Sequence, residues 1–69
     1  MKRFDNMFID CVEINVKTNA INQFEVPFST LANSFEEART QALERGQTMA
    51  RSYNSSSDTT LFFKVCLYR

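Results

Sequence analysis

"NSFEEARTQALERGQTMARSYN", residues 33–54, is the stretch that decides the fold. Ser34 is suited to cap a helix, and Glu37 lies three residues further on, which is the spacing of a capping box. Glu36 and Glu37 suit the positive N-terminal end of a helix, and Arg51 suits the negative C-terminal end. The stretch therefore predicts a helix that begins just after Ser34.

One stripe of this helix is made of apolar or small residues. Its members recur at helical spacing and are Phe35, Ala38, Ala42, Gly46, Met49 and Tyr53. Small residues at the centre of the stripe favour close packing on a sheet, although Gly46 lowers helix propensity by about 1 kcal/mol. We therefore expect one face of the helix to lie on strands.

The residues before the helix predict a β-hairpin. Residues 7–17 and 23–29 each predict a strand, and the Asn-rich residues between them predict a turn. Within 7–17, one apolar set (Val12, Ile14, Val16) alternates with polar residues, and a second set (Met7, Ile9, Cys11) has the opposite phase. Either this strand is apolar on both faces at its start, or a bulge near Asp10 shifts the phase. Pro27 cannot donate to a ladder, so residues 23–29 should form an edge strand.

Residues 59–69, "TTLFFKVCLYR", predict a last strand that is apolar on both faces. One face carries Leu61, Phe63, Val65 and Leu67, and the other carries Phe62, Cys66 and Tyr68 together with Lys64. A half-buried strand would have one polar face. The second apolar face therefore predicts contact with something else.

The order of elements predicts a single α+β domain, residues 1–69, of ββαβ type. We expect a three-stranded antiparallel sheet of order 2-1-3 with one helix packed on one face. The layer under the helix is expected to hold Phe24, Val26, Phe28, Val12, Ile14, Val16, Leu61, Phe63, Val65 and Leu67. The opposite face should then remain uncovered and bind a partner. Its expected partner-binding residues are Ile9, Cys11, Phe62, Lys64, Cys66, Tyr68 and Arg69, with Met7 on the same face.

Composition narrows the classes of function. Eight basic residues balance eight acidic ones, which disfavours nucleic acids and anionic membranes as partners. The chain has no His, no Gly-rich phosphate loop and only two Cys residues, so we predict no enzyme, no metal and no cofactor. No segment reads as a signal peptide or a membrane span. Both thiols are expected to be reduced in a cytoplasmic protein.

Two resemblances add to these expectations. "FEVPFSTLANSFEEARTQALERG", residues 24–46, resembles the strand-to-helix passage of HicB-type antitoxins, in which a Ser-x-Glu-Glu-Ala helix start follows a strand. In size and element order, the chain is similar to small phage-encoded inhibitors, which include anti-CRISPR proteins. That similarity implies a compact protein that blocks a host complex by occupying its surface.

The prediction for function is a non-enzymatic protein-interaction module, in a phage or mobile-element accessory protein that binds and inhibits a host complex. Its partner would be another protein or a second copy of itself in a homodimer, with no membrane and no small-molecule substrate. The alternatives are a small regulator that stacks single-stranded nucleic acid on Phe62 and Tyr68 beside Lys64, and a HicB-like antitoxin.

Overall fold

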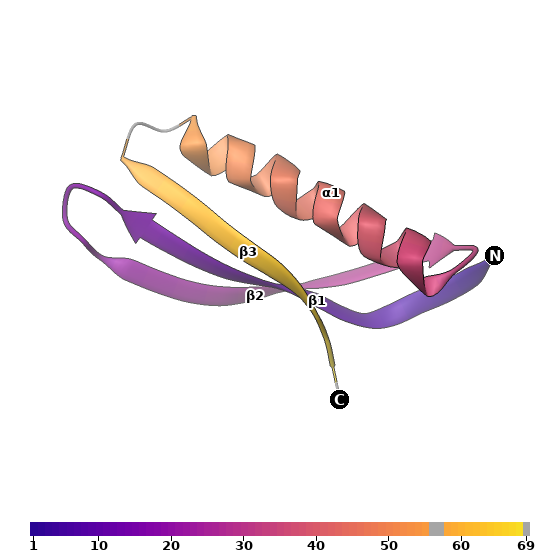
Figure 1. Ribbon diagram of the computed structural model, residues 1–69. Helices are drawn as coiled ribbons and strands as arrows, with labels where there is room; N and C mark the ends of the chain where they lie inside the picture. The colour runs from indigo at the N-terminus through magenta and orange to yellow at the C-terminus, as the bar shows by residue number, and fades with distance from the viewer. Residues whose placement is uncertain (56–57, 69) are drawn as a thin grey trace.

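The computed structural model describes residues 1–55 and 58–68, which form three strands and one helix (Figure 1). The elements are β1 (Lys2–Asn15), β2 (Ile21–Ala32), α1 (Phe35–Asn54) and β3 (Thr59–Leu67). The strands form one sheet of order β2-β1-β3, and β1 pairs antiparallel with both neighbours. The predicted ββαβ α+β fold and its 2-1-3 order are therefore confirmed.

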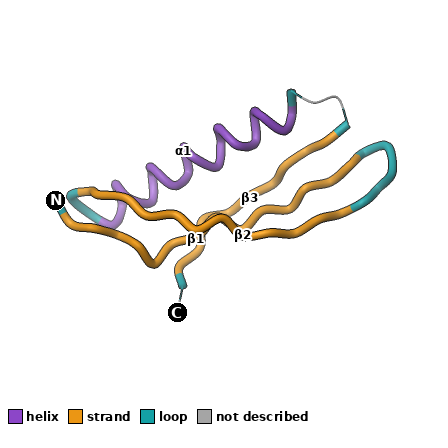
Figure 2. The backbone as a smooth tube through the Cα atoms, turned by 180° about the vertical axis from the view of Figure 1, so that it is seen from behind, coloured by secondary structure: helices purple, strands orange, loops and turns teal. Residues whose placement is uncertain are grey.

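The helix lies on one face of the sheet and packs most closely on β3. Figures 1 and 2 show α1 running along this face from two opposite sides of the molecule. No element within residues 1–55 or 58–68 covers the other face. We call the covered side the helix face and the other side the open face.

The predicted helix start is confirmed. The side chain of Ser34 accepts a hydrogen bond from the Glu37 N–H (3.2 Å), and the Glu37 carboxylate accepts one from the Asn33 N–H (3.1 Å). The reciprocal bond thus reaches one residue further back than in a standard capping box. Glu36 and Glu37 occupy the first turn and Arg51 the last, as the helix dipole favours.

The hairpin between β1 and β2 turns at an Asn residue, as the sequence predicts. Asn19 has a φ of 60°, a left-handed conformation that Asn adopts more easily than most residues. The side chain of Asn15 accepts hydrogen bonds from the N–H groups of Lys17 (3.0 Å) and Thr18 (3.1 Å). These bonds fix the chain reversal and the register of the hairpin.

A bulge lies near the start of β1 and not at Asp10, so of the two alternatives that the sequence left open, a strand apolar on both faces is the one observed. Phe4 pairs with Thr30 and Met7 pairs with Phe28, so two residues of β1 oppose a single residue of β2. The extra residue reverses the alternation and brings Phe4 and Met7 to the same face, where Phe4 packs against the cluster that holds Met7. The pairing through Asp10 itself is regular on both sides.

The core shows that the expected facing of β1 was wrong. Met7, Ile9 and Cys11, which we expected on the uncovered face, lie under the helix with at most 1% of their surface exposed. Val12 and Ile14, expected under the helix, have the opposite phase and lie on the open face. The reason is the register: Ile9 pairs with Val26 and Val65, and Cys11 with Phe24 and Phe63, which are the apolar sets of the outer strands.

Two further residues of the expected buried layer are exposed. Val16 lies in the turn beyond the end of β1 and is 57% exposed, and Leu67 lies at the end of β3 and is 49% exposed. Val16 lies beyond the last paired residue of β1, and Leu67 is the last residue of β3, so neither side chain is enclosed, although Leu67 pairs with the buried Met7. The rest of that layer lies on the helix face and packs into its clusters, as expected: Phe24, Val26, Phe28, Leu61, Phe63 and Val65.

Gly46 packs closely against the sheet. Ala38, Ala42 and Gly46 form the buried stripe of α1. A Cβ built on Gly46 would overlap the ring of Phe63 on β3. The space that the missing side chain leaves is therefore filled by an aromatic ring.

We expect Gly46→Ala to destabilise the protein, although Ala is the better helix former. The gain in propensity is about 1 kcal/mol, whereas overpacking costs typically 1–3 kcal/mol, so a net loss of roughly 1 kcal/mol is expected. Urea unfolding followed by circular dichroism measures it. Gln47→Ala, on the exposed side of the same turn, is the control and should lose nothing. A Gly46→Ala protein as stable as the parent would show that the Phe63 ring moves aside freely.

Loss of the helix cap should also lower stability. Ser34→Ala removes the acceptor for the Glu37 N–H and should decrease the free energy of unfolding by about 1 kcal/mol. Ser34→Asp keeps an acceptor and should restore most of the loss. The same urea titrations test both variants. Equal stability of Ser34→Ala and Ser34→Asp would contradict the capping role.

Candidate interaction surface

The open face is built from side chains of all three strands in regular cross-strand rows. One row joins Gln23, Val12 and Phe62. The next joins Glu25, Asp10 and Lys64, and a third joins Pro27, Phe8 and Cys66. Because strand side chains alternate between faces, these residues share one side of the sheet, opposite the buried Ile9 and Cys11.

Aromatic side chains give the surface two apolar areas. Phe62 is 58% exposed in the first half of β3, and Tyr68 is 42% exposed just beyond the end of this strand. The rings of Phe8 and Tyr68 have centroids 4.5 Å apart and planes tilted by 35°. The Tyr68 N–H donates to the Asn6 carbonyl in the bulge (2.7 Å), which holds Tyr68 beside the start of β1. The bulge therefore helps to position the aromatic pair.

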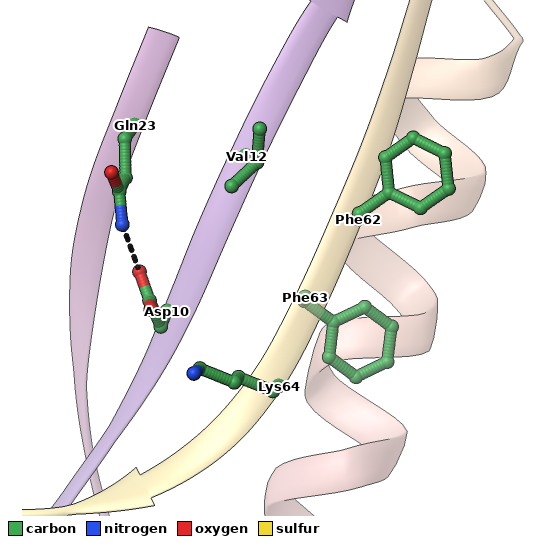
Figure 3. Close-up of a pocket in the computed structure, with 6 residues that line it drawn as sticks. All are labelled: Asp10, Val12, Gln23, Phe62, Phe63 and Lys64. Atoms are coloured by element: carbon green, nitrogen blue, oxygen red, sulfur yellow. Dashed lines mark hydrogen bonds between the residues drawn. The ribbon is translucent and has the colours of Figure 1, made fainter.

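A shallow pocket of about 290 Å³ lies between the two edge strands. Its lining residues are Asp10, Val12, Gln23, Phe62, Phe63 and Lys64. Figure 3 shows the Gln23 side chain directed at Asp10, and its Nε2 donates to the Asp10 carboxylate (3.3 Å). Figure 3 also shows Lys64 extending from β3 toward β1. The polar groups of the pocket thus converge on one carboxylate.

Three charges at the centre of the open face lie in a single row. Glu25, Asp10 and Lys64 are register partners, so two acidic groups and one basic group cross the sheet together. Val12 and Phe62 lie on one side of this charged row, and Pro27, Phe8 and Cys66 lie on the other. A surface of this kind, apolar with a few placed charges, is suited to specific contact with another macromolecule.

Four of the seven sequence-predicted site residues lie on the open face: Phe62, Lys64, Cys66 and Tyr68. Ile9 and Cys11 do not, because both are fully buried beneath the helix. Arg69 lies outside the residues that the structure describes. The described residues predicted on the last strand therefore lie on the open face, whereas those predicted on the first strand lie beneath the helix.

The sequence-based prediction missed Phe8, Val12 and Ile14 as residues of the open face. A signal for them was present: Asp10 has the same phase as all three. A carboxylate under a helix would be desolvated without a partner, so the phase that contains Asp10 should face water. The alternation of Val12 and Ile14 with polar neighbours favours the opposite facing, in which these two residues lie under the helix.

The Cys11 thiol is buried and weakly reactive. Burial raises the pKa of the Cys11 thiol, and the neighbouring Asp10 charge raises it further. This thiol donates weakly to the Ile9 carbonyl (3.7 Å) and stays protonated, which makes it a poor nucleophile. Within residues 1–55 and 58–68, no three acidic or thiol side chains cluster to hold a metal ion. Over the same residues, no helix is long and apolar enough to cross a membrane.

Comparison with known proteins gives no match, whether with family models, with curated sequences or with solved structures. The likeness of residues 24–46 to HicB-type antitoxins therefore remains a prediction from the sequence.

The two cysteines give a direct chemical test of which residues face the solvent. Cys66 is partly exposed and Cys11 is buried. Under native conditions, we expect a thiol reagent to modify Cys66 at least about a hundredfold faster than Cys11, whose reaction requires opening of the fold. Mass spectrometry of tryptic peptides measures both rates. In denaturant the two rates should become similar, and fast native labelling of Cys11 would contradict the facing described here.

Proposed function

We propose that this chain is a non-enzymatic protein-interaction module that docks on its partner through the open face. The observation that carries the proposal is the exposure of Phe62, beside Val12 and across a charged row from the Phe8–Tyr68 pair. Exposed aromatic side chains of this size are typical anchors of protein interfaces. A face of three strands also presents them on a rigid support.

The charges of this face favour a protein over a nucleic acid. Lys64 is accompanied in its row by Asp10 and Glu25, so the row carries a net negative charge. Single-stranded nucleic acids bind to aromatic platforms that lie in a positively charged groove. A phosphate backbone crossing this row would meet two carboxylates and one ammonium group.

The two sheet edges are less suited to docking than the open face. The Leu61 N–H points away from β1 and donates a hydrogen bond to Oδ1 of Asn54 (3.4 Å). The C-terminal end of the helix therefore occupies part of the β3 edge. The Tyr68 N–H points toward β1, and the N–H groups of successive residues point alternately toward β1 and away from it, so that of Leu61 points away. By the same alternation, Pro27 faces the outer edge of β2, where it offers no N–H to an added strand.

The proposed setting is a phage or mobile-element accessory protein that inhibits a host complex by occupying its surface. Its support is the similarity in size and element order to small phage-encoded inhibitors. An affinity pull-down from a bacterial lysate, followed by an activity assay of the captured complex, tests this setting. Inhibition of that complex by the purified protein is the expected outcome.

Phe62→Asp tests the surface itself. Phe62 is exposed, so the variant should keep the parent's helical circular dichroism signal while losing at least about tenfold in affinity for the captured partner. Phe35→Asp is the matched control, because it makes the same change at a half-exposed Phe on the first turn of the helix, away from the open face. Full partner binding by Phe62→Asp would show that the wrong face has been chosen. Salt-sensitive binding to single-stranded oligonucleotides, lost in Phe62→Asp, would replace the proposal with nucleic-acid binding.

A further inference from the structure

We propose that the open face binds a second copy of this chain, about a two-fold axis that runs parallel to the strands through Asp10. This inference rests on the proposed function, because it names the partner of the same surface. Two sheets would then stack face to face with a helix on each outer side. Stacked sheets lie about 10 Å apart, which leaves room for one interdigitated layer of side chains.

The charged row gives the first argument, because it is complementary to itself. Glu25 lies on one edge strand and Lys64 on the other, with Asp10 between them on β1. Rotation about an axis along β1 exchanges the two edges. Lys64 of each copy then lies across from Glu25 of the other, while its own Asp10 lies beside it. Each ammonium group would therefore lie between two carboxylates.

The direction of the axis follows from the same charges. An axis across the strands through this row would place each strand over its own copy, and Lys64 would face Lys64. An axis along the strands avoids that repulsion. It also places Phe62 of one copy across from Gln23 of the other, beside the pocket, and Cys66 across from Pro27. Phe62 of each copy thus meets a polar side chain, and Cys66 meets a side chain of similar size.

The size of the surface sets the strength of the contact. The rows from Ile14 to Tyr68 extend over about 26 Å, and three strands with their side chains are about 15 Å wide, which gives a footprint of roughly 400 Å². This is about half of the roughly 800 Å² per partner that stable specific interfaces bury, and it is typical of weak, transient contacts. The two copies of Asp10 also approach each other on the axis. We therefore expect a reversible dimer with a Kd in about the micromolar range.

Charge reversal tests the inference. Sedimentation of the full chain across about 1 to 100 µM, which brackets the expected Kd, should show a monomer–dimer equilibrium. Lys64→Glu and Glu25→Lys should each weaken the dimer at least about tenfold, because each places like charges across the interface. The double variant Lys64→Glu/Glu25→Lys should restore dimerisation. Both positions are exposed, so all three variants should keep the parent's circular dichroism. Single variants that dimerise like the parent, or a double variant that stays monomeric, would overturn the proposed pairing.

Asp10→Asn tests the position of the axis. It removes the like charges that meet there and keeps an oxygen to accept from Gln23, so the dimer should become at least about threefold tighter. An unchanged or weaker dimer would place the axis elsewhere and overturn the geometry.

The failure of this inference is distinguishable from failure of the proposed function. If the parent chain sediments as a monomer at 100 µM but captures a lysate protein through Phe62, the second copy is excluded as the partner and the proposed function stands. If Phe62→Asp changes neither self-association nor capture, both the inference and the proposed function fail.

Discussion

The contact between the backbone of Gly46 and the ring of Phe63 sets how closely the helix lies on the sheet. Ala38 and Ala42 continue the same buried stripe, so this part of α1 presents almost no side-chain bulk to the strands, whereas Met49 and Tyr53 pack on the sheet further along the helix. The largest fully buried side chains of the core come from the sheet. Met7, Ile9 and Cys11 of the central strand are fully covered because the helix comes down close enough to exclude water.

With a single helix on a three-stranded sheet, the chain has a larger accessible surface than a compact protein of the same mass. The accessible surface is 4,928 Å², whereas a compact monomer of 8.0 kDa has roughly 4,450 Å². The difference belongs to an elongated molecule, 44 Å by 24 Å by 13 Å, with one uncovered sheet face. This face carries Phe62 and Tyr68, two large aromatic side chains that are exposed. Burial of such side chains would add to the stability of a small domain. An interaction through this face would complete the second layer of the fold.

Local signals in the sequence were sufficient for the order and type of the elements. The Ser34–Glu37 spacing predicted the helix start, Pro27 predicted an edge strand, and the alternation of Phe24, Val26 and Phe28 predicted a half-buried β2. The candidate surface was predicted only in part. β3 was correctly assigned because Lys64 marks which of its two apolar faces meets water. β1 was not, because both of its faces contain aliphatic residues.

What the sequence determined by itself is therefore each local choice: where the helix is capped, where the chain turns and which strand is an edge. Strand pairing in the tertiary structure decided which apolar set of β1 became core, although the charge of Asp10 is a local signal for the same choice. The two phases of β1 are similar in hydrophobicity, so alternation alone does not choose between them. Pairing with β2 and β3 does, because the register places Ile9 between Val26 and Val65 and turns Val12 to the other side. Strand pairing is a long-range interaction, and a shift of one residue exchanges the two faces completely.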